Sequence, residues 1–316
     1  MASRPQPGPG RHLRTPPPDA GGREAGQPDV TVAIVTHDSE AVLDGCLQSL
    51  PAALGHLSAR VVVVDSGSQA PPTTAVARHP GAELLDLGAN RGYAAGINAA
   101  WSVAPARSLL VLNPDVALDP GAAEELMAGL DTPGTGITVP RLVDGAGAAL
   151  RSLRREPTLA RALGEALLGG SRAGRVPALG EVVTAARSYR EPTPADWATG
   201  AAMLVSRACL EAVGPWDDSF FLYSEETEFC LRARDAGFRL RLAPGARAVH
   251  AGGEAHTSPA LWALLSGNRL RLYRARHGPV AGAAYRLVLV LGSALRAGRG
   301  RHHRAALAAL LRPAQR

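Results

Sequence analysis

The sequence predicts an α/β fold built on a doubly wound sheet, and three observations carry this prediction. Apolar runs of strand type alternate with helical patterns over the first 130 residues of the 316-residue chain. The four consecutive valines at 61–64 are typical of a strand buried on both faces, as in a parallel sheet. The runs end in the polar turns THDS, DSGS and NPD. Because such sheets bind ligands beyond the carboxyl ends of their strands, these three turns are expected to meet in one crevice.

The expected elements follow one another in a regular order. Four apolar runs closed by polar residues are each expected to contain a strand, at 29–39, 59–68, 81–89 and 108–116. Stretches with helical spacing that open with Ser, Gly or Pro predict helices at 39–50, 92–104 and 120–130. Later in the chain the patterns predict a strand and short helix at 198–214, a helix at 224–237, and a strand pair or one bent strand at 239–250.

Three parts of the chain differ in composition. Residues 1–28 are rich in Pro, Gly and Arg and are expected to form a disordered leader. Residues 29–257 are expected to form the main domain, and residues 258–316 a basic helical region. Between 131 and 195 the pattern is less regular. The apolar run 136–143 stands out there, and the Arg- and Gly-rich stretch after it receives no assignment.

Charge and cysteine content exclude several kinds of protein. The net charge is +6 and the pI about 9.9, yet the basic stretches near both ends lack interleaved aromatics, so no nucleic-acid partner is expected. Cys46, Cys209 and Cys230 lie far apart without CxxC spacing, which argues against a disulfide framework or a zinc site. There is no signal-peptide pattern and no apolar stretch of the ~20 residues that a membrane span needs, so a cytoplasmic location is expected.

Two polar turns are candidates for nucleotide binding. Asp65, in VVVVDSGS, would either cap a turn with Ser66 or bind the base or ribose of a nucleotide. In NRGYAAGIN, Gly92 and Gly96 would either bring the backbone close to a diphosphate at a helix N-terminus or serve close packing. The GxGxxG spacing is absent, so a dinucleotide-binding fold is not supported.

Three further groups of residues could carry chemistry. Asp115, in LNPD, would either end a strand in a turn or supply an oxygen ligand to a divalent cation that neutralises a diphosphate. His250 becomes a credible ligand only if Asp115 lies across the same crevice. Glu225, Glu226 and Glu228 open a helix after FFLY, where they would either interact with the helix dipole or provide a general base towards an alcohol.

Taken together, these stretches resemble the family 2 glycosyltransferases, which are inverting enzymes of the GT-A fold, and most of all the rhamnosyltransferase-type members. The resemblance covers roughly residues 30–278 and depends on the order of its pieces: VAIVTHDS, VVVVDSGS, NRGYAAGIN, LLVLNPDV, WATGAAMLVSR, GPWDDSFFLYSEETEFCLRARDAGFRL, AVHAGG and NRLRLYRARHGP. It implies a doubly wound mixed sheet with a Rossmann-like nucleotide-binding half, an acceptor-binding half and C-terminal helices.

The resemblance implies donor-binding roles for seven residues in the first half of the chain. The nucleoside would be contacted by Thr36, His37 and Asp65. The donor pocket would be lined by Asn90, Arg91, Gly92 and Asn98.

It also implies a metal site and an acceptor site. NPD stands where many members have an Asp-x-Asp motif, so Asp115 would bind Mg²⁺ or Mn²⁺ with His250, while Asn113 replaces the first acid and would lie at the substrate. In the stretch WATG, Trp197 and Gly200 would lie near the sugar and the acceptor. The general base would be Glu226, with Glu225 as second candidate.

The implied activity is inverting transfer of a sugar from a nucleoside-diphosphate donor to a hydroxyl of a glycan or lipid-linked acceptor, in cell-wall or polysaccharide synthesis. Rhamnose from dTDP-rhamnose is the first expectation. A UDP-hexose donor, or a non-catalytic nucleotide-sugar-binding protein, is the alternative. The basic helices after residue 258 would either pack on the core or lie on an anionic membrane, which would make the protein peripheral on the inner face of the cell membrane.

Overall fold

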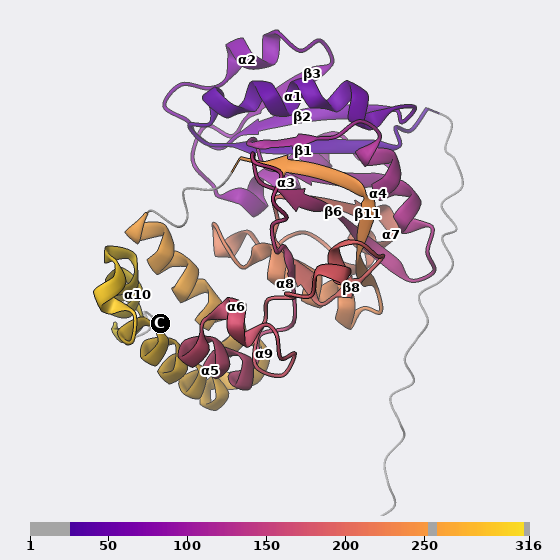
Figure 1. Cartoon of the computed structure of the whole chain (residues 1–316). Coiled ribbons are helices and arrows are strands. Elements are labelled where there is room, and N and C mark those ends of the chain that lie inside the picture. The colour runs from indigo at the N-terminus through magenta and orange to yellow at the C-terminus, as the bar shows by residue number, and fades with distance from the viewer. Residues whose placement is uncertain (1–25, 252–257, 313–316) are drawn as a thin grey trace, which may run out of the picture.

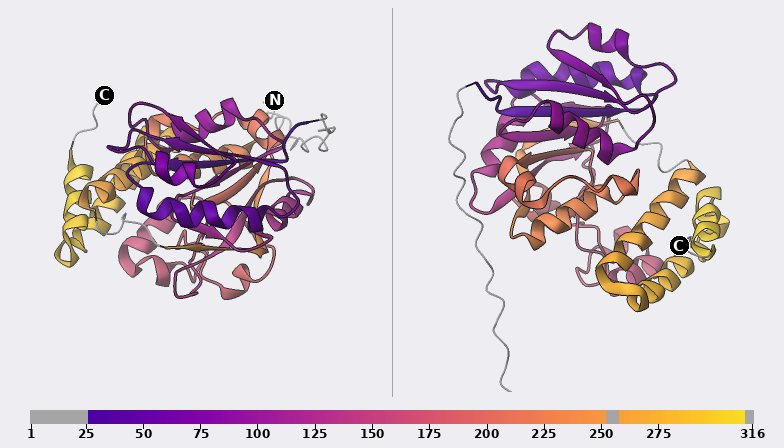
Figure 2. Two further views of the ribbon diagram at one scale, coloured as in Figure 1. Left: turned by 90° about the horizontal axis from the view of Figure 1, so that it is seen from above. Right: turned by 180° about the vertical axis from the view of Figure 1, so that it is seen from behind.

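The structure, a computed structural model, describes residues 26–251 and 258–312. Its strands form one large mixed sheet, and its last helices form a separate cluster beside that sheet (Figure 1). Figure 2 shows the same separation from two further directions. The disordered leader expected over residues 1–28 lies outside the described residues, except for 26–28.

The first half of the sheet is parallel, as the alternation of strands and helices predicts. β1 (Val30–Thr36) lies between β2 (Ala59–Asp65) and β4 (Ser108–Leu112), and β3 (Ala82–Asp86) pairs with the outer side of β2. Thr36 pairs in register with Asp65, so β1 and β2 end at one edge of the sheet. The four expected strands are confirmed, and the turns that follow them start from neighbouring positions.

The second half makes the sheet mixed. β10 (Ala202–Ser206) runs antiparallel to both β4 and β6 (Thr135–Val143), and the described strands follow the order β3-β2-β1-β4-β10-β6-β11-β5. β11 (Arg239–His250) is one strand with a register shift between Ala243 and Arg247, which confirms the bent strand. It also pairs with β5 (Val116–Leu118) and β8 (Pro194–Ala195), while β7 (Leu153–Arg154) and β9 (Trp197–Ala198) form a separate ribbon.

Helices cover both faces of the sheet. One face carries α1 (Glu40–Leu54), α2 (Thr73–Ala77) and α4 (Ala122–Leu130). The other carries α3 (Tyr93–Val103), α7 (Arg207–Val213) and α8 (Glu225–Asp235). Side chains of β1 alternate between the two cores, as the pleat of a strand requires: Val32 faces α1, and Ala33 faces α3.

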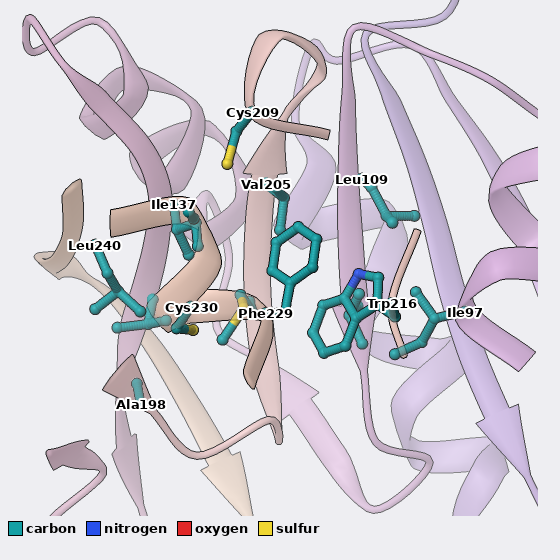
Figure 3. Close-up of a cluster of buried hydrophobic side chains, with 14 of the residues drawn as sticks. Ile97, Leu109, Ile137, Ala198, Val205, Cys209, Trp216, Phe229, Cys230 and Leu240 are labelled. Atoms are coloured by element: carbon teal, nitrogen blue, oxygen red, sulfur yellow. The ribbon is translucent and has the colours of Figure 1, made fainter. Parts of the chain in front are cut away.

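The core beneath α3 and α8 contains the main aromatic contact of the sheet domain. Trp216 and Phe229 stack with ring centroids 4.5 Å apart, between Ile97 on one side and Val205 on the other (Figure 3). Aromatics make up only 4% of the sequence, so this pair supplies bulk that Val, Leu and Ala cannot. It also fixes the start of α8 relative to α3.

The chain after residue 258 is helical, as expected. α9 (Pro259–Ala294) bends at Gly278, where φ is 82°, and α10 (Arg301–Leu311) folds back on it. The stretch without an assignment contains α5 (Leu159–Leu168) and α6 (Gly170–Ala173), and α5 packs on α9 around Tyr273 and Tyr285. Short 3₁₀ turns complete the elements: η1 (Ala186–Tyr189), η2 (Asp218–Phe220) and η4 (Ala297–Arg299).

Candidate active site

The loops after β1 and β2 are joined by the carboxylate of Asp65. This side chain is fully buried, and its Oδ1 accepts hydrogen bonds from Thr36 Oγ1 at 3.2 Å and Ser68 Oγ at 2.5 Å. Its Oδ2 accepts from the backbone N–H of Ser68 at 3.0 Å. The structure thus gives Asp65 the turn-stabilising task. Contact of Asp65 or Thr36 with a nucleoside stays a prediction.

A second loop, residues 88–92, lies against the first. The φ of Gly67 is +68°, and a Cβ atom there would lie 2.4 Å from Asn90 N. The backbone N–H of Arg91 donates to Ser66 Oγ at 3.0 Å, and His37 Nδ1 lies 3.0 Å from Ser66 O. The Arg91 guanidinium is exposed and forms no hydrogen bond or ion pair with another described residue. The two loops therefore bring three exposed residues together: His37, Asn90 and Arg91. The guanidinium of Arg91 is available there to bind a diphosphate.

The start of α3 touches the turn that precedes α8. The φ of Gly92 is +85°, and a Cβ atom there would lie 2.2 Å from Phe221 O. Next to it, Tyr93 N donates to Phe221 O at 2.8 Å. Only glycine permits this approach. Farther along α3, both ends of the Asn98 amide bond the backbone of Trp216 at 2.9 Å, so this side chain fastens α3 to the chain before α8, and its contact with a donor stays a prediction.

The hydroxyl of Tyr93 lies where the predicted pieces meet. It is 2.8 Å from Asn113 Oδ1 in the NPD turn and 3.2 Å from Gly200 O in WATG. A Cβ atom at Gly200 would lie 3.3 Å from Glu226 Cβ. Burial, followed by the charges of Glu225, Glu226 and Asp115, raises the pKa of Tyr93 well above its usual value. The NPD turn, WATG and the start of α8 therefore meet around Tyr93, at a junction that we call the crevice.

The two predicted metal ligands face each other. β5 and β11 pair in a register that sets His250 opposite Val116, next to Asp115. His250 Nε2 lies 3.2 Å from Asp115 Oδ2, and both side chains are less than one fifth exposed. The angle is not that of a hydrogen bond, so the buried Nε2 atom has no hydrogen-bond partner among the described residues. A carboxylate oxygen and an unsatisfied imidazole nitrogen at this distance fit a divalent cation.

Two protein groups, Asp115 and His250, are the candidates for holding a metal ion at this position. Within residues 26–251 and 258–312 no group of three or more His, Cys, Asp or Glu side chains is close enough to hold a metal ion. Mg²⁺ is commonly held by one or two carboxylates together with substrate phosphates. Asp115 and His250 thus fit a cation that binds together with the diphosphate of a donor.

The carboxylates at the start of α8 are unusually placed. Glu225 is 3% exposed, and Oε2 of Glu225 and of Glu226 each lacks a hydrogen-bond partner in the described part of the chain. Burial and then the charge of Glu226 raise the pKa of Glu225 to about 8. Burial also raises the pKa of Glu226, although backbone N–H groups of the first helical turn oppose it. The two carboxyl groups therefore titrate as a pair, and burial favours the protonated form of both.

Strained backbone leads into these carboxylates. Phe221, Tyr223 and Ser224 have positive φ angles of 63°, 67° and 76°. Conformations of this kind cost of order 1–3 kcal/mol each and cluster at functional sites. On the other side of the crevice, Trp197 Nε1 donates to Arg155 O at 3.0 Å, and its ring lies 5.7 Å from the guanidinium carbon of Arg154. Trp197 is thus fixed beside a cation.

Three residues of this region were missed by sequence reasoning. Tyr93 stands within the quoted motif NRGYAAGIN, and a phenol at the first helical position is a signal that could have been followed. Arg154 lowers the pKa of Glu226 by its charge but lies in the stretch without an assignment. Asn268 lies far along the chain in α9 and binds the turn before α8. A cavity of about 290 Å³ lies elsewhere, between α5, α9 and α10, and no predicted site residue lines it.

The chain matches known sequences over most of its length. The model of Glycosyl transferase family 2 matches residues 31–178, and that of Glycosyl transferase family group 2 matches residues 178–266. An N-acetylglucosaminyl-diphospho-decaprenol L-rhamnosyltransferase of Mycobacterium tuberculosis is 31% identical over 235 residues, which are 69% of this chain and 75% of the relative. The low-salt glycan biosynthesis hexosyltransferase Agl10 of Haloferax volcanii is 28% identical over 227 residues, or 70% and 67% of the two chains.

Solved structures share the fold. A mannosyltransferase from Pyrobaculum calidifontis, solved with GDP-Man and Mn²⁺, has a TM-score of 0.56 at 15% identity and covers 91% of this chain and 86% of its own. GalNAc-T7, solved with UDP, GalNAc and Mn²⁺, has a TM-score of 0.55 at 14% identity, and the match covers 79% of this chain and 48% of GalNAc-T7. The expected GT-A-type mixed sheet with C-terminal helices is thereby confirmed.

Proposed function

From the premise that the chain belongs to glycosyltransferase family 2, we propose that it transfers rhamnose from dTDP-rhamnose to a hydroxyl of a lipid-linked glycan. That it is a glycosyltransferase of cell-wall or other glycan synthesis follows from its family and relatives. One observation supports the proposed mechanism. The Tyr93 hydroxyl hydrogen-bonds Asn113 and Gly200, and it lies close enough to three carboxylates for their charges to raise its pKa: Asp115, Glu225 and Glu226.

The reaction is one displacement. The acceptor oxygen attacks the anomeric carbon and forms the new glycosidic bond, while the bond to the nucleoside diphosphate breaks and its electron pair stays on the diphosphate oxygen. Glu226 takes the hydroxyl proton of the acceptor as the new bond forms. Attack from the side opposite the leaving group inverts the anomeric centre. Burial raises the pKa of both Glu225 and Glu226, and we assign the base to Glu226 because it packs against Gly200, beside the Tyr93 hydroxyl.

Positive charge meets the leaving group from two directions. A divalent cation held by Asp115 and His250 would neutralise the charge that develops on the diphosphate. The free guanidinium of Arg91 stands at the rim of the same crevice and supports the diphosphate from the α3 side. Preorganised charge of this kind usually lowers the reaction barrier more than any other single effect in an active site.

The rhamnose donor is supported by the Mycobacterium tuberculosis relative, whose name assigns it L-rhamnosyl transfer. A UDP-hexose is the second candidate, because the Haloferax volcanii relative is named a hexosyltransferase. A screen of donor hydrolysis over dTDP-, UDP- and GDP-sugars, each with and without Mn²⁺, separates the two. We expect nucleotide release from dTDP-rhamnose above all others; release only from UDP-sugars would overturn the donor, and release from none would overturn the function.

The lipid part of the acceptor is supported by the basic helical region. Residues 258–316 contain eleven arginines and no Asp or Glu, so the net charge of +6 for the chain leaves −5 for residues 1–257. Exposed leucines lie four residues apart near the end of α9, at Leu287, Leu291 and the C-cap residue Leu295. Leu163 and Leu167 are exposed on α5, which packs on α9. Apolar side chains within a region of uniform positive charge suit the surface of an anionic bilayer.

Both sequence-based expectations for these helices therefore have support. Their inner faces pack together, with Tyr285 and Leu310 buried, while the outer leucines remain exposed. None of the described helices is long and apolar enough to cross a membrane. We expect the chain to sediment with liposomes that contain anionic lipid, and the double substitution Leu287→Glu and Leu291→Glu to abolish this. Val42→Glu, at an exposed apolar position on α1, is the matched control, and equal sedimentation of all three proteins would contradict the proposed contact.

A further inference from the structure

The turn at residues 220–224 has a backbone that it would not adopt alone. Three of its five residues have positive φ angles, and none of them is glycine. Leu222 N donates to Phe220 O at 2.7 Å, which closes a tight three-residue turn around Phe221. Because α8 begins at Glu225, directly after this turn, contacts that hold the turn also place the first residues of α8.

Most of those contacts come from one side chain on α9. Nδ2 of Asn268 lies 2.8 Å from Phe220 O, 2.8 Å from Leu222 O and 3.1 Å from Tyr223 O. An amide nitrogen carries two hydrogens, so at least one of them is shared between two carbonyl groups. Asn268 is 7% exposed, so water has little access to these carbonyls. Of the two other carbonyls of the turn, Phe221 O accepts the N–H of Tyr93, and Ser224 O accepts the N–H of Glu228 within α8.

We propose that Asn268 is a positioning residue for sugar transfer, because its amide holds the 220–224 turn and thereby directs the Glu225–Glu226 pair into the crevice. The inference deepens the proposed function and rests on it. Glu226 packs against Gly200, next to the Tyr93 hydroxyl, so a small shift of the turn moves the base relative to the acceptor site. A misplacement of about 1 Å can cost about 10²-fold in rate.

Two substitutions test this role. Asn268→Asp keeps the shape of the side chain but donates no hydrogen bond once ionised, and Asn268→Ala removes the amide. For both we expect kcat to fall by about 10²-fold with the donor KM within about threefold of wild type. The acid limb of the kcat–pH profile should also move to lower pH, since a loosened turn lets water reach the carboxylates of Glu225 and Glu226.

Leu310→Ala is the control for a purely structural effect. Leu310 is 2% exposed on α10, which packs on α9, and it lines the cavity between α5, α9 and α10. This variant should lower Tm and keep the wild-type kcat–pH profile. The proposal is overturned if both Asn268 variants keep kcat and its pH profile within about twofold of wild type. It is also overturned if the Asn268 variants behave like Leu310→Ala. In that case their kcat would fall only in proportion to their loss of Tm, and their kcat–pH profile would match the wild type.

A measurement without substrate separates this inference from the proposed function. Amide hydrogen exchange of residues 219–230 should be faster in Asn268→Ala than in the wild type and in Leu310→Ala. Unchanged protection of this segment would overturn the positioning role even for an active enzyme. A wild-type protein that turns over no nucleotide sugar would overturn the proposed function. Faster amide exchange in Asn268→Ala would even then support the conclusion that Asn268 stabilises the 220–224 turn.

Discussion

Asp65 at the end of β2 and Glu225 at the start of α8 are both buried carboxylates, with exposed fractions of 0% and 3%. Asp65 accepts three hydrogen bonds from Thr36 and Ser68. Glu225 leaves Oε2 without a partner in the described part of the chain, and its pKa rises to about 8. One acid stabilises its own loop, and the other costs free energy to bury.

The difference extends to the two sides of the crevice. The donor side consists of the loops after β1 and β2 together with residues 88–92. Hydrogen bonds join these loops to one another, so their shape is present before a ligand binds. The catalytic side combines positive φ angles at 221–224 with unsatisfied atoms of Glu225, Glu226 and His250. Three of the four non-glycine residues with positive φ in the described chain lie in this turn, the fourth being Asp38 on the donor side, and strain of this kind persists only where the rest of the fold compensates for it. Substitutions should therefore affect stability on the donor side and rate on the catalytic side.

The largest effect is expected for Glu226→Gln. The amide cannot take a proton, so kcat should fall by about 10²–10⁴-fold. The shift of Tm on adding the donor nucleotide should stay as in the wild type, since the residue lies on the acceptor side. Glu228→Gln is the control, because Glu228 pairs with Arg232 on the same helix and stands outside the crevice. Initial rates of sugar transfer decide; a Glu226→Gln rate within tenfold of wild type would remove the base assignment.

His250→Ala should change the requirement for metal. Loss of one of two protein ligands should raise the Mn²⁺ concentration for half-maximal rate by about tenfold or more. The additional stabilisation that Mn²⁺ gives in thermal unfolding with the donor nucleotide present should weaken in parallel. His56→Ala removes an exposed histidine outside every predicted site and should leave both measurements unchanged. Equal Mn²⁺ dependence in all three proteins would argue against the Asp115–His250 site.

Third in size is the effect of Asp65→Asn on stability. An amide in place of the carboxylate turns one acceptor into a donor, which leaves a hydrogen bond of Thr36 or Ser68 unmade. The cost should be about 1–3 kcal/mol in the free energy of unfolding. Urea denaturation measures this, with Asp86→Asn as control because Asp86 is an exposed acid with one bond, to Gly88 N. If Asp65→Asn is destabilised but keeps the wild-type kcat, the contrast between the donor side and the catalytic side is confirmed. If its free energy of unfolding equals that of the wild type, the contrast is wrong.

The donor side could be predicted from the sequence because its information is local. Strand periodicity places β1, β2 and β4, and the residues just after each strand must then share an edge. The catalytic side depends on contacts over long separations. Nothing near Asn268 in the sequence shows that its amide meets carbonyls 45 to 48 residues earlier. Asn98 stands in a motif that predicts a donor-pocket residue, and the motif does not reveal that both ends of its amide also bond the backbone of Trp216, 118 residues later.

The smallest effect is a pH dependence of stability that Glu225 adds to the catalytic side. Its pKa is raised from 4.5 to about 8 in the folded protein, so the stability it contributes is fully present below pH 4.5 and is lost as pH rises through about 8. The slope is at most about 1.4 kcal/mol per pH unit. Glu225→Gln cannot ionise, so its Tm should fall less steeply than that of the wild type between pH 5 and pH 8. Glu226, whose pKa is raised as well, keeps a part of the slope in this variant. Thermal unfolding across this range decides, with Glu228→Gln expected to follow the wild type, and parallel curves for Glu225→Gln and wild type would show that Glu225 is satisfied in the fold as Asp65 is.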